Sequence, residues 1–105
     1  MINLEEILIF VCEYFKVDIQ LMNSKSRREE LVIARFMYAV LAIKYTRETY
    51  EQIGRQIDRN YSTICYAKKT TKSIPFFNAI YERVNKEFTE KLIGILNTKN
   101  ERDLF

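Results

Sequence analysis

The sequence predicts an all-α fold, a bundle of about six helices with a long C-terminal helix. The chain has 105 residues, the length of one domain, and 48% of them are hydrophobic, so we treat residues 1–105 as a single domain with one core. Two glycines and one proline supply too few turn residues for several β-strands. Apolar residues instead recur at three- and four-residue intervals, as in amphipathic helices.

The N-terminal segment predicts one helix and one short helical turn. Apolar spacing places the helix over about residues 3–15, begun by an Asn3 N-cap with Glu6 three positions on. Asp18 begins the short turn, whose apolar residues would close the base of the core. These residues are Ile19, Leu21 and Met22.

A long helix follows and is expected to be the centre of the bundle. Ser26 is its predicted N-cap, with Glu29 at the capping-box position, and it runs to about Tyr45. Only two of the residues from 31 to 45 are charged, so this helix is expected to be buried on most sides.

Two short helices come next. Thr49 and Gln52 form a capping box for a helix over about 50–57, and after a break at residues 58–60, Asn60 caps a helix over about 61–73. Two short helices across a three-residue turn are a helix-turn-helix candidate. In the second helix the residues expected to face inward are Ile64, Cys65 and Ala67. Those left outside are Tyr61, Ser62, Tyr66, Lys68, Lys69 and Lys72.

A final helix is predicted over about 75–97. Pro75 suits its first turn, where the missing N–H costs nothing, and residues 97–105 are expected to form a frayed polar tail. The apolar stripe of this helix consists of Phe77, Ile80, Val84, Phe88, Leu92 and Ile95.

Composition excludes much enzyme chemistry. The chain has no histidine, the usual general base near neutral pH and a common zinc ligand. Gly54 and Gly94 stand alone, so no P-loop or Rossmann phosphate turn is present. The hydroxyl groups of Tyr61 and Tyr66 could in principle act as nucleophiles, but no histidine, set of metal ligands or pair of acidic residues accompanies them. We therefore expect no enzyme activity and no cofactor or metal.

The remaining composition favours a cytoplasmic protein. Cys12 and Cys65 lack CxxC spacing and lie in apolar helical runs, as reduced core cysteines do. The N-terminus lacks the basic region of a secretory signal, and no stretch of about 20 apolar residues could span a membrane.

Positive charge gathers in the middle of the chain. Residues 25–72 contain eleven basic and five acidic residues, a net charge of +6, whereas the remainder has six basic and nine acidic residues, a net charge of −3. A basic centre that contains a helix-turn-helix candidate favours binding to a phosphate backbone. The alternative is an ordinary solvated face, because helix surfaces are routinely rich in lysine and arginine.

Four segments, in order and at similar spacing, resemble the C-terminal DNA-binding domain of the bacterial replication initiator DnaA. They are VCEYFKVD at 11–18, SKSRREELVIAR at 24–35, YEQIG at 50–54 and NYSTI at 60–64. The resemblance covers about residues 4–73. It implies a Trp-repressor-like helix-turn-helix domain that binds double-stranded DNA.

The resemblance also implies a basic loop that enters the minor groove. Arg27 matches the family's minor-groove arginine, for which a guanidinium is suited to the negative potential of a narrow groove. Lys25 and Arg28 flank it as phosphate contacts or, alternatively, as ordinary solvated charges. Arg35 matches a family arginine near the DNA backbone. Its alternative is a structural ion pair with Glu5, Glu6 or Glu51.

Residues 60–63 occupy the family's DHTT position at the start of the recognition helix. Side chains there point at base edges, so Asn60 can pair with adenine and Ser62 or Thr63 can contact a base; helix capping is the alternative for Asn60. Tyr66 matches a family position, and outward-facing charge adds the lysines as backbone contacts. The predicted DNA-binding set is Lys25, Arg27, Arg28, Arg35, Arg59, Asn60, Tyr61, Ser62, Thr63, Tyr66, Lys68, Lys69 and Lys72.

The chain also departs from the family pattern. Tyr61 replaces a histidine, Asn60 an aspartate, and Phe36 stands where glutamine is common. The family's Gly-Gly-Arg stretch is shortened to Asp58-Arg59. Because no ATPase segment precedes the domain, we expect a stand-alone transcription regulator or accessory replication factor, from a phage or mobile element.

The alternative function is a protein-protein interaction module on the same scaffold. The final helix carries four aromatic residues, Phe76, Phe77, Tyr81 and Phe88, which would make a homodimer or bind a partner if they extended past the core. The competing interpretation is that they simply cover the core.

Overall fold

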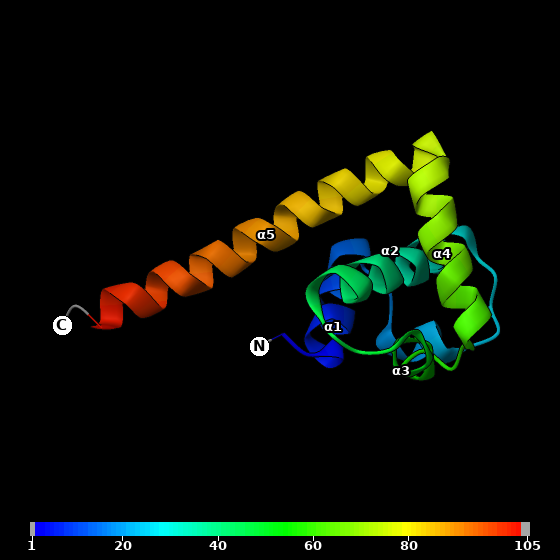
Figure 1. Cartoon of the computed structure of the whole chain (residues 1–105), viewed down its shortest axis with the longest axis horizontal. Helices are drawn as coiled ribbons and strands as arrows, with labels where there is room; N and C mark the ends of the chain where they lie inside the picture. The colour runs from blue at the N-terminus through cyan, green and yellow to red at the C-terminus, as the bar shows by residue number, and fades with distance from the viewer. Residues whose placement is uncertain (1, 104–105) are drawn as a thin grey trace.

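The computed structural model describes residues 2–103, with side-chain surroundings for residues 2–94, and confirms the all-helical bundle (Figure 1). Its elements are α1 (Leu4–Phe15), the 3-10 helix η1 (Ile19–Asn23), α2 (Glu29–Tyr45), α3 (Tyr50–Arg55), α4 (Tyr61–Ser73) and α5 (Pro75–Asp103). No strand occurs in this described part of the chain.

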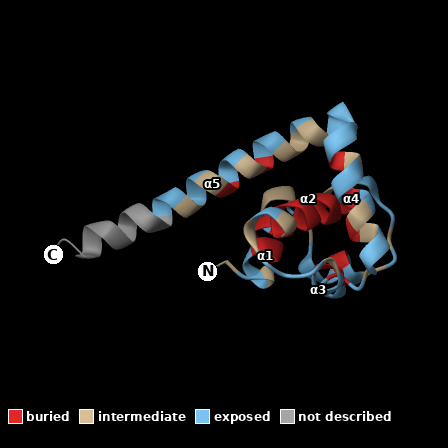
Figure 2. Ribbon diagram, in the orientation of Figure 1, coloured by how far each residue is buried: buried red, intermediate tan, exposed pale blue. Residues whose placement is uncertain are grey.

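Helix α2 is the centre of the bundle, as its composition predicts. It contacts α1, α3, α4 and α5, and the residues from Ala34 to Ala42 are all buried (Figure 2). The hydroxyl of Tyr38 donates a hydrogen bond of 3.0 Å to the Ile53 carbonyl of α3, and burial raises the pKa of this tyrosine. One polar bond through the core therefore fixes α3 against α2.

Asp18 caps η1 as predicted, its side chain accepting from the Gln20 amide, and three of the four N-caps predicted for the α-helices are confirmed. The Asn3 side chain accepts from the Glu6 amide, Thr49 and Gln52 make a reciprocal capping box, and the Asn60 side chain accepts from the Thr63 amide. These bonds satisfy amide groups that the first turn of each helix leaves without partners.

The fourth predicted cap, Ser26 with Glu29, is wrong. Helix α2 begins at Glu29 after Arg28, which makes no side-chain capping bond. The Ser26 carbonyl accepts instead from the guanidinium of Arg35, at 2.7 Å, and residues 26–28 have no regular secondary structure. Two acidic residues in the first turn of α2, Glu29 and Glu30, supply favourable charge to the helix terminus.

The turn between α3 and α4 is tight, and Gly54 permits it. Helix α3 ends at Arg55, two residues earlier than predicted, and the Arg59 amide donates to the Gly54 carbonyl at 2.8 Å. A Cβ at Gly54 would lie 2.5 Å from the Arg59 carbonyl oxygen, closer than side chains allow. The backbone of Asp58 completes the turn in the left-handed helical conformation, with a φ angle of 53°.

Helix α5 turns back after α4 and crosses the bundle over α2 and α1 (Figure 1). It begins at Pro75 as predicted, but it continues to Asp103, so the expected frayed tail is wrong up to that residue. Residues 104 and 105, and the side chain of Ile95, lie outside the described residues.

The aromatic residues of α5 mainly cover the core. Phe88 is buried, and Phe77 and Tyr81 pack against the core while half-buried; only Phe76 of these four is exposed, at 52%. The Tyr45 hydroxyl of α2 donates a hydrogen bond of 2.5 Å to Asn85 of α5. This packing favours the core-covering interpretation over a dedicated interaction surface.

Candidate DNA-binding surface

The basic loop and the start of α4 lie on either side of one groove. Its volume is about 460 Å³, and it lies between residues 24–28, which we call the basic loop, and the turn that leads into α4. The lining residues are Lys25, Arg27, Val32, Arg35, Phe36, Asp58, Arg59 and Thr63. Four of these eight are basic and one is acidic, so the groove carries net positive charge and suits an anionic strand.

Arg35 lies inside the protein, which corrects its predicted role as a surface contact. The side chain is 6% exposed. Its Nε donates to the Met22 carbonyl, Nη1 to Ser26, and Nη2 to Leu21 and Ser24, at 2.7 to 3.0 Å. The partners are thus backbone carbonyls, and the alternative, an ion pair with Glu5, Glu6 or Glu51, is not among the interactions of the described residues.

Arg59 is half-buried and also bonds within the protein. Its Nη2 donates to the Ser24 carbonyl at 2.6 Å, and its Nη1 donates to the carbonyls of Ile57 and Asp58 at 3.1 Å each. Burial lowers the pKa of Arg35, and the neighbouring charge of Arg59 lowers it further. The guanidinium of Arg59 is therefore engaged by backbone carbonyls at the groove.

The other basic-loop residues are exposed as predicted. Lys25, Arg27 and Arg28 all lie at the surface. Arg28 approaches Glu30 at 4.0 Å, but both side chains are more than half exposed, and such surface pairs contribute little to stability. These three cations are thus available to a phosphate backbone.

At the start of α4, the Asn60 side chain is already occupied by capping. Its Oδ1 accepts from the Thr63 amide at 3.3 Å and from the Ser62 hydroxyl at 2.6 Å. A two-bond contact with adenine needs both the carbonyl oxygen and the amide nitrogen of asparagine. While the cap holds, Asn60 can offer a base only its Nδ2 donor.

The outer face of α4 presents a mixed polar and aromatic surface. Ser62, Tyr66 and Lys69 are exposed, and the Tyr66 ring packs edge-on against Phe36 at 5.9 Å. Lys72 is exposed one turn further on. Cys65 is only half-buried, so the prediction that it faces the core is wrong, because its helical position lies between the inner and outer faces.

Tyr50, which sequence reasoning missed, joins α3 to this surface. Its ring lies 5.6 Å from that of Tyr61, and its hydroxyl accepts a hydrogen bond of 3.1 Å from the Lys68 Nζ. A side-chain hydrogen bond with Cys65 raises the pKa of Tyr61. The sequence marks Tyr50 only as an aromatic residue at the start of α3. Its partners, Tyr61 and Lys68, follow 11 and 18 residues later.

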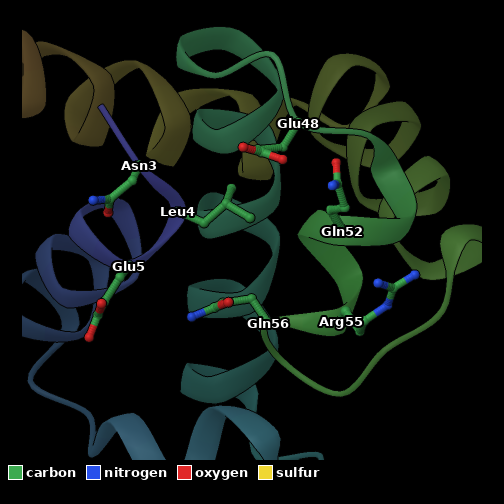
Figure 3. Close-up of a pocket in the computed structure, with 7 residues that line it drawn as sticks. All are labelled: Asn3, Leu4, Glu5, Glu48, Gln52, Arg55 and Gln56. Carbon is green, nitrogen blue, oxygen red and sulfur yellow. The ribbon is translucent and has the colours of Figure 1, made fainter. Parts of the chain in front are cut away.

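A second hollow, of about 540 Å³, lies between the start of α1 and α3 (Figure 3). The side chains of Glu5 and Arg55 lie on opposite sides of it in Figure 3, and Glu48 lies at a third edge. Charged groups that do not converge make no binding or catalytic constellation. We therefore place the candidate site at the basic groove.

A short helix, a tight turn and a second helix with an exposed polar face, packed on a central helix, define a helix-turn-helix protein. The chain belongs to the bacterial DnaA helix-turn-helix family: the model described as "Bacterial dnaA protein helix-turn-helix" matches residues 4–70. No helix in the described residues is long and apolar enough to cross a membrane.

Similar curated proteins are chromosomal replication initiator proteins DnaA. The protein of Flavobacterium psychrophilum is 28% identical over 92 residues, 87% of this chain and 19% of that protein. The protein of Oleidesulfovibrio alaskensis is 30% identical over 89 residues, 80% of this chain and 19% of that protein. The protein of Bacteroides thetaiotaomicron is 33% identical over 72 residues, which are 68% of this chain and 15% of that protein. The chain thus spans less than a fifth of the length of these relatives, and no solved structure matches it.

Proposed function

We propose that this chain binds double-stranded DNA sequence-specifically, with the N-terminal half of α4 in the major groove and Arg27 in the adjacent minor groove. The observation that carries the proposal is the basic groove, which has Arg27 on one side and the start of α4 on the other. Membership of the DnaA helix-turn-helix family supports the same function.

In the proposed complex one DNA strand would lie in the groove. Two elements that enter adjacent grooves of a duplex are separated by one sugar-phosphate strand, so that strand would lie between the basic loop and α4. Lys25 and Arg28 on one side, and Lys68, Lys69 and Lys72 along α4, are exposed cations that can neutralise phosphates.

Base recognition would come from few groups. Ser62, Tyr61 and the Asn60 Nδ2 stand at the exposed start of α4, and the ring of Tyr61 can stack on a sugar or contact a thymine methyl. Arg27 would read groove width and potential rather than base identity. We propose that the domain acts as a transcription regulator or accessory replication factor by occupying such a site.

The test is equilibrium binding of a labelled duplex at a series of salt concentrations. Neutralisation of phosphates by the five exposed cations named above predicts a slope of about −4.5 in log K against log salt. The double variant Arg27→Ala with Lys69→Ala should weaken binding strongly, and the matched control Lys86→Ala, on an exposed position of α5, should not. Binding that is independent of salt, or unchanged in the double variant, would refute the proposal.

The same preparation tests the interaction-module alternative. Sedimentation of the free chain distinguishes a monomer from a dimer. A dimer would predict an inverted pair of half-sites on DNA, whereas a monomer predicts a single asymmetric site.

A further inference from the structure

The carbonyl oxygen of Ser24 accepts hydrogen bonds from two arginines that belong to different parts of the fold. Arg35 of α2 donates through Nη2 at 3.0 Å, and Arg59, in the turn before α4, donates through Nη2 at 2.6 Å. A carbonyl has two lone pairs, so both bonds can form together. Ser24 is the first residue of the basic loop.

These bonds tie the basic loop to α2 and to the turn before α4. Residues 24–28 have no regular secondary structure, and the loop's internal bonds through the Ser24 and Ser26 hydroxyls are long, at 3.3 and 3.4 Å. Arg35 adds donors to the carbonyls of Met22 and Ser26 on either side. Charge-assisted bonds of this kind are the stronger ones.

The tie lies close to both proposed DNA contacts. Arg27 is three residues from Ser24, and Asn60 directly follows Arg59. A shift of the Ser24 carbonyl would therefore move the minor-groove arginine relative to the start of the recognition helix. The distance between those two elements must match the distance between adjacent grooves of the duplex.

We infer that Arg35 and Arg59 are positioning residues, which act through the Ser24 carbonyl to hold the basic loop and α4 at the spacing that simultaneous minor- and major-groove contact requires. The inference rests on the proposed function. The two guanidinium groups lie beside the groove, so a phosphate strand in the groove would offset their mutual repulsion and reinforce the tie on binding.

The first measurement needs no DNA. Amide hydrogen exchange of residues 24–28 in the free protein should accelerate in Arg59→Ala and stay unchanged in Arg83→Ala, which removes an exposed arginine of α5. Circular dichroism of both variants verifies that the helices remain. Unchanged exchange in the loop of Arg59→Ala would overturn the tie itself, whatever the protein binds.

The second measurement uses a duplex selected from a random pool by the unmodified protein. Arg59→Ala should weaken binding to this duplex about tenfold or more, Arg59→Lys should not restore it, and the salt slope should stay unchanged. Adding Arg27→Ala should cost little further affinity, because Arg27 is then already misplaced.

A direct phosphate contact by Arg59 gives the opposite pattern. Binding by Arg59→Lys would then match that of the unmodified protein. The salt slope of Arg59→Ala would be shallower by about 0.9, and the losses of affinity in Arg27→Ala and Arg59→Ala would add. That outcome overturns the positioning role and leaves DNA binding intact. If the unmodified protein selects no duplex, the proposed function fails, and the exchange measurement still decides the tie.

Discussion

Arg35 and Arg59, which both line the basic groove, donate to the same carbonyl oxygen, that of Ser24. Two of the positive charges that a sequence pattern assigns to DNA are therefore engaged inside the protein. The cations left for phosphates are those exposed on the basic loop and along α4. This division between supporting and contacting residues underlies the first prediction.

Arg35→Met should destabilise the fold. Methionine fills a similar volume but removes the Arg35 donors to the carbonyls of Met22 and Ser26, and one of the donors to the carbonyls of Leu21 and Ser24. We expect a loss of about 2–4 kcal/mol in the free energy of unfolding, measured by urea denaturation. Arg83→Met, at an exposed position of α5, should change it by less than about 0.5 kcal/mol. Equal effects of the two variants would contradict the structural role of Arg35.

Gly54→Ala should destabilise the helix-turn-helix. The added Cβ would lie 2.5 Å from the Arg59 carbonyl oxygen, a backbone atom that cannot move without opening the turn. We expect a loss of about 2 kcal/mol, larger than the gain in helix propensity. At Gly94 a Cβ meets nothing within 4 Å, so Gly94→Ala should raise stability slightly. A neutral Gly54→Ala would show that the turn is looser than described.

Thr71→Val should stabilise the protein. Thr71 is buried on the inner face of α4, and its Oγ1 has no hydrogen-bond partner among the described residues. Replacing the hydroxyl by a methyl group of the same shape removes a desolvation cost of about 1 kcal/mol, which raises Tm by about 4 °C or more. Thr70→Val, at a half-exposed site on the same helix, serves as the control. A lower Tm for Thr71→Val would mean that the hydroxyl is satisfied.

The two cysteines should differ in reactivity. Cys12 is buried and burial raises the pKa of its thiol, whereas Cys65 is half-buried on α4. An alkylating reagent followed by mass spectrometry should label Cys65 first. Saturating duplex DNA should slow the labelling of Cys65 and leave that of Cys12 unchanged. Protection of neither thiol would place the DNA on another face.

Sequence reasoning succeeded where the determining contacts are local. Asn3, Thr49 and Asn60 were predicted as caps because each bonds an amide three residues away. Spacing along the helix likewise predicted the burial of Ile64 and Ala67 on α4. The end of α5 was misplaced because polar residues continue a helix readily, and no glycine or proline after Gly94 stops it.

Errors arose where contacts join distant segments. The sequence predicts Ser26 as an N-cap, but in the structure its carbonyl accepts a hydrogen bond from Arg35, nine residues later. The role of Tyr50 depends on Tyr61 and Lys68, which α4 brings beside it only in the folded chain. Neither arrangement leaves a periodic signal. Which exposed residues touch DNA stays a prediction.

Selection of bound duplexes from a random pool, followed by sequencing, tests the central claim most directly. Sequence-specific binding through two adjacent grooves predicts one enriched motif: a few defined base pairs read by the start of α4, next to an A·T-rich stretch that Arg27 enters. The Arg27→Ala variant should keep the first part and lose the second. A pool that enriches no motif would contradict sequence-specific DNA binding by this chain.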